Sequence, residues 1–128
     1  MPCIGDTFLL ANASINNHLF IIISDPAMDA ERIVVANFTS WRADKDQSCI
    51  VEPGEHSFVT RRSCVHYAED KLIALKQYAQ LLGVAAIVPQ DPVTRKLLDR
   101  ILDGAAISPF IPLGNRQILV DQGLIDRT

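Results

Sequence analysis

A histidine, two neighbouring hydroxyls and two adjacent arginines are the residues of this chain best suited to chemistry. They are His18, Thr39, Ser40, Arg61 and Arg62. The imidazole of histidine gains and loses a proton near neutral pH, so it can act as a general base and a general acid. A guanidinium ion binds a phosphate through paired hydrogen bonds, and a hydroxyl can hold an oxygen atom of the same group. Together these residue types suit proton transfer beside a phosphate, provided that the fold brings them to one place.

Two predicted strands would bring His18 and Thr39 together. Residues 19–23 are bulky, mostly β-branched or aromatic, and are closed by Asp25-Pro26, which predicts a strand buried on both faces at the centre of a sheet. The next apolar run, residues 33–38, follows closely enough to favour antiparallel pairing with the first. In that arrangement His18 starts one strand at the corner where Thr39 ends the other. This corner is the predicted functional site.

The rest of the first half also predicts short strands and polar connections. Further strands are expected at residues 4–10, 49–51, 57–60 and 63–67, with a polar loop at 12–17, a short connection at 27–32 and an exposed loop at 41–48. Proline and glycine at the middle positions of Glu52-Pro53-Gly54-Glu55 predict a type II turn. The first half is therefore expected to be all β.

The second half changes to helical periodicity. Apolar residues at spacings of three and four predict a helix over residues 69–82 that Gly83 would end. A second helix is expected from Asp91, which would cap it, to residue 103, with Gly104 as a left-handed stop. A third, shorter helix is expected at about residues 113–121. We therefore predict one domain that is mainly β with C-terminal helices, namely a small β barrel over residues 1–68 followed by a helical extension over 69–128.

The composition limits the class of protein. The chain has 128 residues, of which 48% are hydrophobic and 21% charged, and this is typical of one globular domain. Its net charge of −3 argues against broad electrostatic adhesion to nucleic acid or to an anionic membrane, although a local basic patch is compatible with it. The sequence shows no signal peptide and no apolar run long enough to cross a bilayer. We expect a cytoplasmic protein whose three cysteines are reduced thiols.

The candidate residues also have structural interpretations. A histidine at the edge of an apolar strand is more often a structural residue than a functional one. Hydroxyls at a strand end commonly bond the local backbone, and an Arg-Arg pair commonly forms a solvated turn. Trp41, the only tryptophan, would stack on a base if exposed, or else cover one end of the barrel.

Other chemistries have weaker support. Cysteine and histidine alternate at Cys49, His56, Cys64 and His66, but no pair has the short spacing of structural zinc sites, so we predict no metal and no cofactor. Cys64 and His66 point in parallel from one strand, which does not suit a nucleophile and its base. The glycines stand apart and form no phosphate-binding loop.

With these strands placed, residues 4–76 resemble the MazF/PemK toxin family, which are endoribonucleases on an SH3-like barrel. The resemblance lies in an opening Gly-Asp, an apolar second strand, a third strand ending in Thr or Ser, and a Ser-x-Val-like segment before the last strands. These correspond to Gly5-Asp6-Thr7-Phe8, residues 19–24, residues 34–40 and Ser63-Cys64-Val65. The family's Gly-x-Glu-type loop and its Gln-(Ile/Val)-(Arg/Lys) stretch have no counterpart here.

The resemblance implies roles for the candidate residues. In the family, an Arg at the start of the second strand and a Thr or Ser at the end of the third are implicated in RNA cleavage. Thr39 matches the latter, whereas His18 stands in place of the Arg. His18 and Thr39 are then the expected catalytic residues. The residues expected to bind the substrate are Ser40, Trp41, Arg61 and Arg62.

Two functions follow as hypotheses. The first is a toxin-like, metal-independent endoribonuclease that cleaves single-stranded RNA and is restrained by an antitoxin protein. The alternative is a non-catalytic module that kept the barrel and binds a protein or peptide. A homodimer is plausible through an open barrel edge or through the amphipathic helices.

Overall fold

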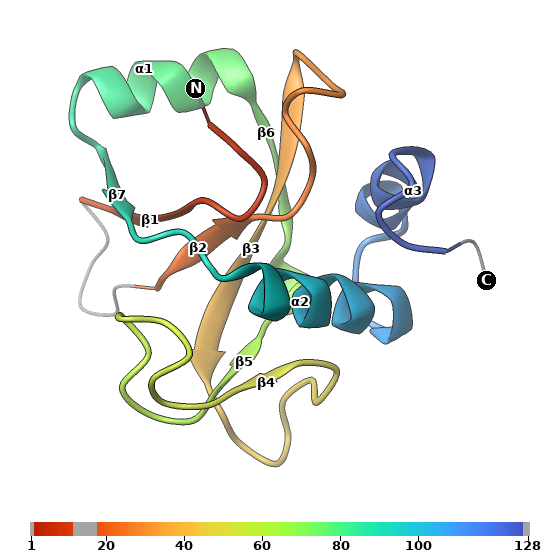
Figure 1. Cartoon of the computed structure of the whole chain (residues 1–128). Coiled ribbons are helices and arrows are strands. Elements are labelled where there is room, and N and C mark those ends of the chain that lie inside the picture. Colours follow the sequence, from red (N-terminus) through yellow and green to blue (C-terminus); the bar gives the residue numbers. More distant parts are fainter. Residues whose placement is uncertain (1, 12–17, 127–128) are drawn as a thin grey trace.

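The fold is a mixed β and α structure built on one seven-stranded antiparallel sheet (Figure 1). It is seen in a computed structural model that describes residues 2–11 and 18–126. The strands are β1 (Thr7–Leu10), β2 (Phe20–Ile22), β3 (Arg32–Ser40), β4 (Ile50–Val51), β5 (Ser63–Val65), β6 (Lys71–Ala74) and β7 (Ile87–Gln90). The helices are a 3-10 turn, η1 (Tyr67–Glu69), and α1 (Leu75–Gly83), α2 (Arg95–Ile107) and α3 (Leu113–Asp121).

Strand β3 is the longest strand and organises the sheet. One of its edges pairs with β2, and the other pairs with β6 near its start and with β5 near its end. The remaining order runs from β2 to β1 and β7 on one side and from β5 to β4 on the other. No pairing joins β4 to β7 among the described residues, so the sheet is not a closed barrel.

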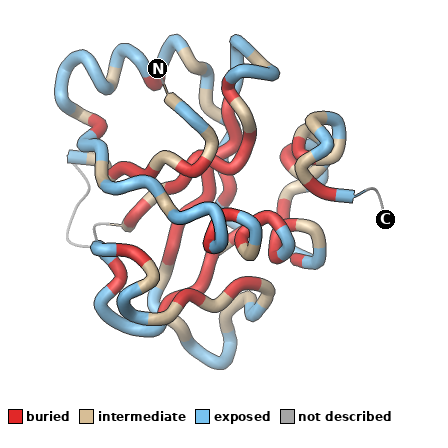
Figure 2. Tube along the Cα trace, viewed as in Figure 1, coloured by how far each residue is buried: buried red, intermediate tan, exposed pale blue. Residues whose placement is uncertain are grey.

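The alternation of side chains along β2 and β3 creates two cores. Residues of one face, including Ile21 and Ala36, pack against α2 and α3, and residues of the other face, including Ile22 and Val35, pack against Tyr78 of α1. The buried segments therefore run along the sheet and the inner sides of the helices (Figure 2). A strand is confirmed within the predicted residues 19–23, but it is shorter, because β2 covers Phe20–Ile22. Leu19 and Ile23 flank it and are buried, as are Ile21 and Ile22, whereas Phe20 is half-buried.

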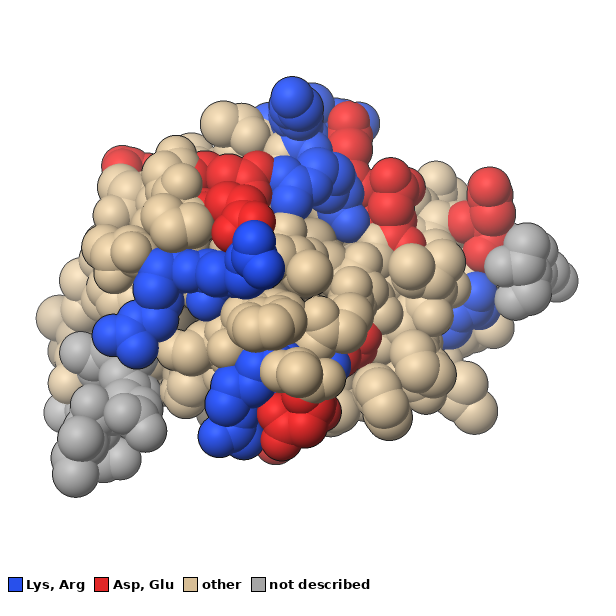
Figure 3. Space-filling view, turned by 90° about the horizontal axis from the view of Figure 1, so that it is seen from below, with Lys and Arg blue, Asp and Glu red and all other residues tan. Residues whose placement is uncertain are grey.

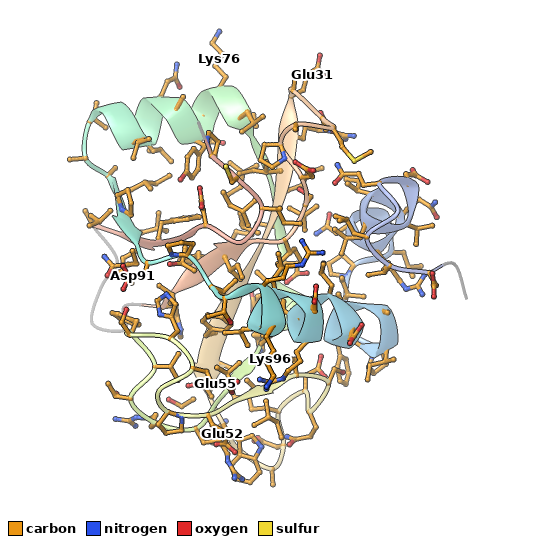
Figure 4. The ribbon with its side chains drawn as sticks, in the orientation of Figure 1. Glu31, Glu52, Glu55, Lys76, Asp91 and Lys96 are labelled. Atoms are coloured by element: carbon orange, nitrogen blue, oxygen red, sulfur yellow. The ribbon has the colours of Figure 1, made fainter. Side chains whose placement is uncertain are left out.

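The predicted turn and α3 are confirmed. Glu55 donates its backbone N–H to the Glu52 carbonyl at 3.2 Å, and Gly54 has a φ of +92°, as a type II turn requires. Helix α3 spans Leu113–Asp121 and follows Pro112. The turn is held against α2, where Arg100 binds the carboxylate of Glu55, and Lys96 also lies close to Glu55 (Figure 4).

The predicted helix over residues 69–82 is wrong in its first half. Residues 71–74 form β6, and the helix begins only at Leu75 and includes Gly83 as its last residue. The reason is tertiary, because the first half of β3 offers an unpaired edge, and Lys71 to Ala74 satisfy it with register partners Val35 to Arg32. The left-handed residue after α1 is Ala85, with a φ of 60°, and not a glycine.

Other boundaries also differ from the predictions. Residues 57–60 form no strand, and β7 was not expected. Helix α2 begins at Arg95, and its cap is Thr94, whose hydroxyl accepts the Leu97 N–H at 3.1 Å. Gly104 lies inside α2 and not after it. The predicted loop 12–17 is outside the described residues.

Candidate functional site

The predicted corner between β2 and β3 is formed. The register pairs Phe20 with Asn37, and Phe38 donates its N–H to the Leu19 carbonyl at 2.9 Å, which sets His18 opposite Thr39. Residues two apart on a strand share a face, so His18 and Thr39 continue the face that carries Phe20 and Asn37. The antiparallel arrangement inferred from the sequence therefore brings these two side chains together.

The hydrogen bonding of His18 determines its neutral tautomer. Its Nδ1 lies 3.1 Å from the carbonyl oxygen of Phe38. A carbonyl oxygen only accepts hydrogen bonds, so Nδ1 carries the proton. The lone pair of the neutral ring is then on Nε2, which bonds to none of the residues the structure describes. This is the state that a general base needs.

A first cavity of about 490 Å³ lies at this corner and is partly open to solvent. It is lined by His18, Leu19, Phe38, Thr39, Ser40, Phe58, Val59, Thr60, Arg61 and Ser63. The cavity thus gathers an imidazole, several hydroxyls and a guanidinium ion. Four of the six residues named from the sequence as site candidates are among them, namely His18, Thr39, Ser40 and Arg61.

The loop over residues 56–61 forms one wall of this cavity and is anchored by a buried histidine. His56 Nδ1 accepts the Phe58 N–H at 3.0 Å, and its Nε2 donates to the carbonyl oxygen of Asp91. Both ring nitrogens are therefore engaged in holding the loop. The side chain of Phe58 remains 37% exposed beside the cavity. His56 thus has a structural role, because it holds the loop that forms this wall of the cavity.

The two other predicted site residues lie outside both cavities. Arg62 makes two hydrogen bonds of 2.9 Å to the carboxylate of Glu52, and its guanidinium carbon lies 5.5 Å from the Trp41 ring centroid. Trp41 donates its indole N–H to Gln47 at 2.7 Å. Arg62 therefore already has a carboxylate partner, and one face of Trp41 is occupied by Arg62.

A second cavity of about 460 Å³ adjoins the first and shares His18 and Thr39 with it. Its other lining residues are Phe20, Asn37, Lys45, His66, Glu69 and Lys71. From the sequence, His66 was considered only as a metal ligand or as a base beside Cys64, and the other five residues were not considered as site candidates. The sequence carries no signal for them, because they meet only through the register of distant strands. The backbone of His66, just after β5, bonds to Asn37 of β3, and Lys71 of β6 is paired with Val35 of β3.

The charges around the two cavities are distributed unevenly. Among the described residues, arginines paired with carboxylates lie elsewhere on the surface, namely Arg32, Arg42, Arg62, Arg95 and Arg100. By contrast, Arg61, Lys45 and Lys71 form no ion pair with any described residue. Figure 3 shows basic and acidic side chains interspersed on the side of the molecule that carries loop 41–48. The cavities therefore hold positive charge in an acidic protein.

The two buried cysteines, Cys49 and Cys64, are poorly suited to act as nucleophiles. Burial raises the pKa of Cys49 to about 11 and also raises the pKa of Cys64, so both thiols are protonated at neutral pH. Within residues 2–11 and 18–126, no group of three or more His, Cys, Asp or Glu side chains could hold a metal ion. No helix in this part of the chain is long and apolar enough to cross a membrane.

Comparison with known proteins supplies no family. No protein-family model matches the chain, and no curated protein is significantly similar to it in sequence. The function is therefore inferred from the residues of the site.

Proposed function

We propose that this protein is a toxin-like endoribonuclease that cleaves single-stranded RNA without a metal ion. The observation that carries the proposal is that His18, Thr39 and Arg61 line one cavity, with the lone pair of His18 on Nε2. The resemblance of residues 4–76 to MazF/PemK toxins supports it, and with it an SH3-like curvature of the sheet. The same resemblance suggests a cytoplasmic protein that an antitoxin restrains and that pairs as a homodimer.

The proposed reaction is an internal transfer at phosphorus. His18 Nε2 takes the proton of the ribose 2′-hydroxyl, and the 2′-oxygen forms a bond to phosphorus as the bond to the 5′-oxygen breaks. The imidazolium then returns its proton to the departing 5′-oxygen, so one histidine completes the proton balance. The products are a 2′,3′-cyclic phosphate and a 5′-hydroxyl.

Two other groups would stabilise the phosphate as its charge increases. Arg61 lines the cavity and has no carboxylate partner among the described residues, so its guanidinium is available to the phosphate oxygens. The hydroxyl of Thr39 would donate to another oxygen of the same phosphate. Ser40 lines the same cavity and would contact the neighbouring ribose or phosphate.

The test is cleavage of a labelled, mixed-sequence single-stranded RNA by purified protein in the presence of a metal chelator. We expect fragments ending in a 2′,3′-cyclic phosphate, and no cleavage of the matching DNA, which lacks the 2′-hydroxyl. His18→Ala should reduce the rate by about 100-fold or more, as for the loss of a general base. Thr39→Ala should also reduce it, and Lys76→Ala, on the exposed side of α1, should not.

The same experiment can reject the proposal. Cleavage that persists at the full rate in the folded His18→Ala variant would remove His18 from the mechanism. A folded wild-type protein that leaves every RNA intact would favour the non-catalytic binding module. In that case, capture of a protein partner should survive both His18→Ala and Thr39→Ala.

A further inference from the structure

The second cavity contains a nearly buried polar group that bonds through its side chain to none of the described residues. Asn37 lines it and is only 9% exposed, yet its side-chain amide makes no hydrogen bond to the residues that the structure describes. Among the described residues, the fully buried polar side-chain atoms without a partner belong to Asp70, so the amide atoms of Asn37 open onto the cavity and can bond to a ligand there. An amide in this state beside a cavity indicates a ligand with hydrogen-bonding groups.

The charge of the cavity indicates the kind of ligand. Lys45 and Lys71 line it without carboxylate partners among the described residues, and Glu69 is the single carboxylate among its described lining residues. An oxygen of that carboxylate lies 3.8 Å from Nε2 of His66. Two lysines thus face one carboxylate in this cavity. The unmatched charge is positive, which favours an anionic ligand.

An aromatic ring completes the lining. Phe20 is half-buried, and its ring stacks on Phe8 with centroids 5.4 Å apart and planes 15° apart. This stacking holds Phe20 in place on the sheet face. A cation, an amide and a fixed aromatic ring are the groups that proteins use to bind a phosphate and a base of a single strand.

The register separates the backbone of Lys71 from that of Thr39. Lys71 is paired with Val35, four residues before Thr39 on β3, which is a distance of about 13 Å along the strand. A lysine at that distance would contact a neighbouring phosphate of the same strand. Because the two cavities share His18 and Thr39, a chain crossing both would place one phosphate at the shared residues.

We propose that the second cavity binds the nucleotide adjacent to the scissile phosphate, so that the substrate class is an oligoribonucleotide and not a mononucleotide or a cyclic phosphate. Lys45 and Lys71 bind its phosphate, Asn37 bonds to its base and Phe20 contacts the base. This inference rests on the proposed function for the position of the scissile phosphate. The binding of a single strand in the cavity is testable by itself.

The experiment measures binding and cleavage separately. A fluorescent 2′-O-methyl oligonucleotide of mixed sequence cannot undergo internal attack, and its affinity is measured by anisotropy at several salt concentrations. We expect the double variant Lys45→Ala/Lys71→Ala to bind about tenfold or more weakly, and its salt dependence to fall by about 0.7 for each phosphate that the protein no longer neutralises. Asn37→Ala should weaken binding without changing the salt dependence.

A matched control is available on α1. Lys76 points away from the molecule (Figure 4), so Lys76→Ala removes a lysine without touching the cavity and should bind as the wild type does. Unchanged affinity in the double variant would overturn the second-cavity proposal even if wild-type RNA cleavage is observed. Loss of binding in the double variant, with no cleavage by the wild type, would support the nucleotide site and reject the proposed reaction.

Discussion

The phenol oxygen of Tyr67 lies 2.5 Å from the carbonyl oxygen of Ile101, and donates a hydrogen bond from η1 to the middle of α2. Both residues are fully buried. Helix α2 also approaches Tyr67 closely at Gly104, where Ser48 and Cys49, just before β4, lie against the helix as well. Glycine has no side chain to keep these segments apart. This contact fixes α2 on the sheet face that is opposite the second cavity.

Gly104→Ala should destabilise the protein substantially. The added Cβ would overlap the Tyr67 hydroxyl and lie 2.8 Å from Cys49 Cβ and 2.9 Å from the Ser48 carbonyl oxygen. Because backbone atoms are among these neighbours, relief requires a shift of the loop, and we expect a loss of about 2 kcal/mol or more. Urea unfolding measures the loss. Gly114→Ala in α3 has open space around it and should be neutral or stabilising by up to about 1 kcal/mol.

Thr94→Ala should destabilise α2 by about 1 kcal/mol, because the Thr94 hydroxyl accepts the N–H of Leu97 at the start of the helix. The residue expected from the sequence to cap this helix, Asp91, instead accepts a hydrogen bond from Ser57 at the surface. Asp91→Ala should therefore cost less than Thr94→Ala. Equal losses in thermal unfolding would contradict this assignment of the cap.

Asp70→Asn should make the protein more stable at neutral pH. Asp70 is 8% exposed, both its carboxylate oxygens lack partners among the described residues, and burial, followed by the charge of Asp46, raises its pKa from 3.8 to about 8. The folded state therefore binds a proton that the unfolded state releases above about pH 4.

The contribution of Asp70 thus falls as the pH rises from about 4 to about 8, by at most about 1.4 kcal/mol per pH unit. Urea unfolding of the wild type and of Asp70→Asn across this range isolates the effect, since other titrating groups are common to both. The advantage of Asp70→Asn should increase toward pH 8. An advantage that does not vary with pH would show that Asp70 titrates normally in the folded state.

Arg61→Ala and Arg62→Ala should differ in their effect on RNA cleavage, although the residues are adjacent. Arg61 lines the first cavity, whereas Arg62 is held by Glu52 and covers Trp41. Loss of a guanidinium that stabilises the transition state should reduce kcat by about 100-fold. We expect this reduction for Arg61→Ala and little change for Arg62→Ala. The reverse order would require Arg62 to leave Glu52 and enter the site.

The local sequence pattern was sufficient to predict the His18–Thr39 corner, which is formed by two strands adjacent in the sequence. Residues 19–23 and 33–38 carry enough β-branched and apolar side chains, with a short connection, to define two antiparallel neighbours. The corner that joins His18 to Thr39 follows directly from that pairing. Turn chemistry at Pro53 and Gly54 and the position of α3 were predictable for the same reason, since each depends on a few consecutive residues.

Only the tertiary structure determined the elements that depend on distant partners. Residues 71–74 have helical periodicity, but the free edge of β3 makes them a strand, since a buried backbone edge must find hydrogen bonds. That strand brings Lys71 to the second cavity, and the pairing of β5 with β3 brings His66 there. The sequence by itself therefore determined the His18–Thr39 corner through local pairing. Long-range strand register, which no local pattern encodes, decided the lining of the second cavity, including Lys71, which has no carboxylate partner among the described residues.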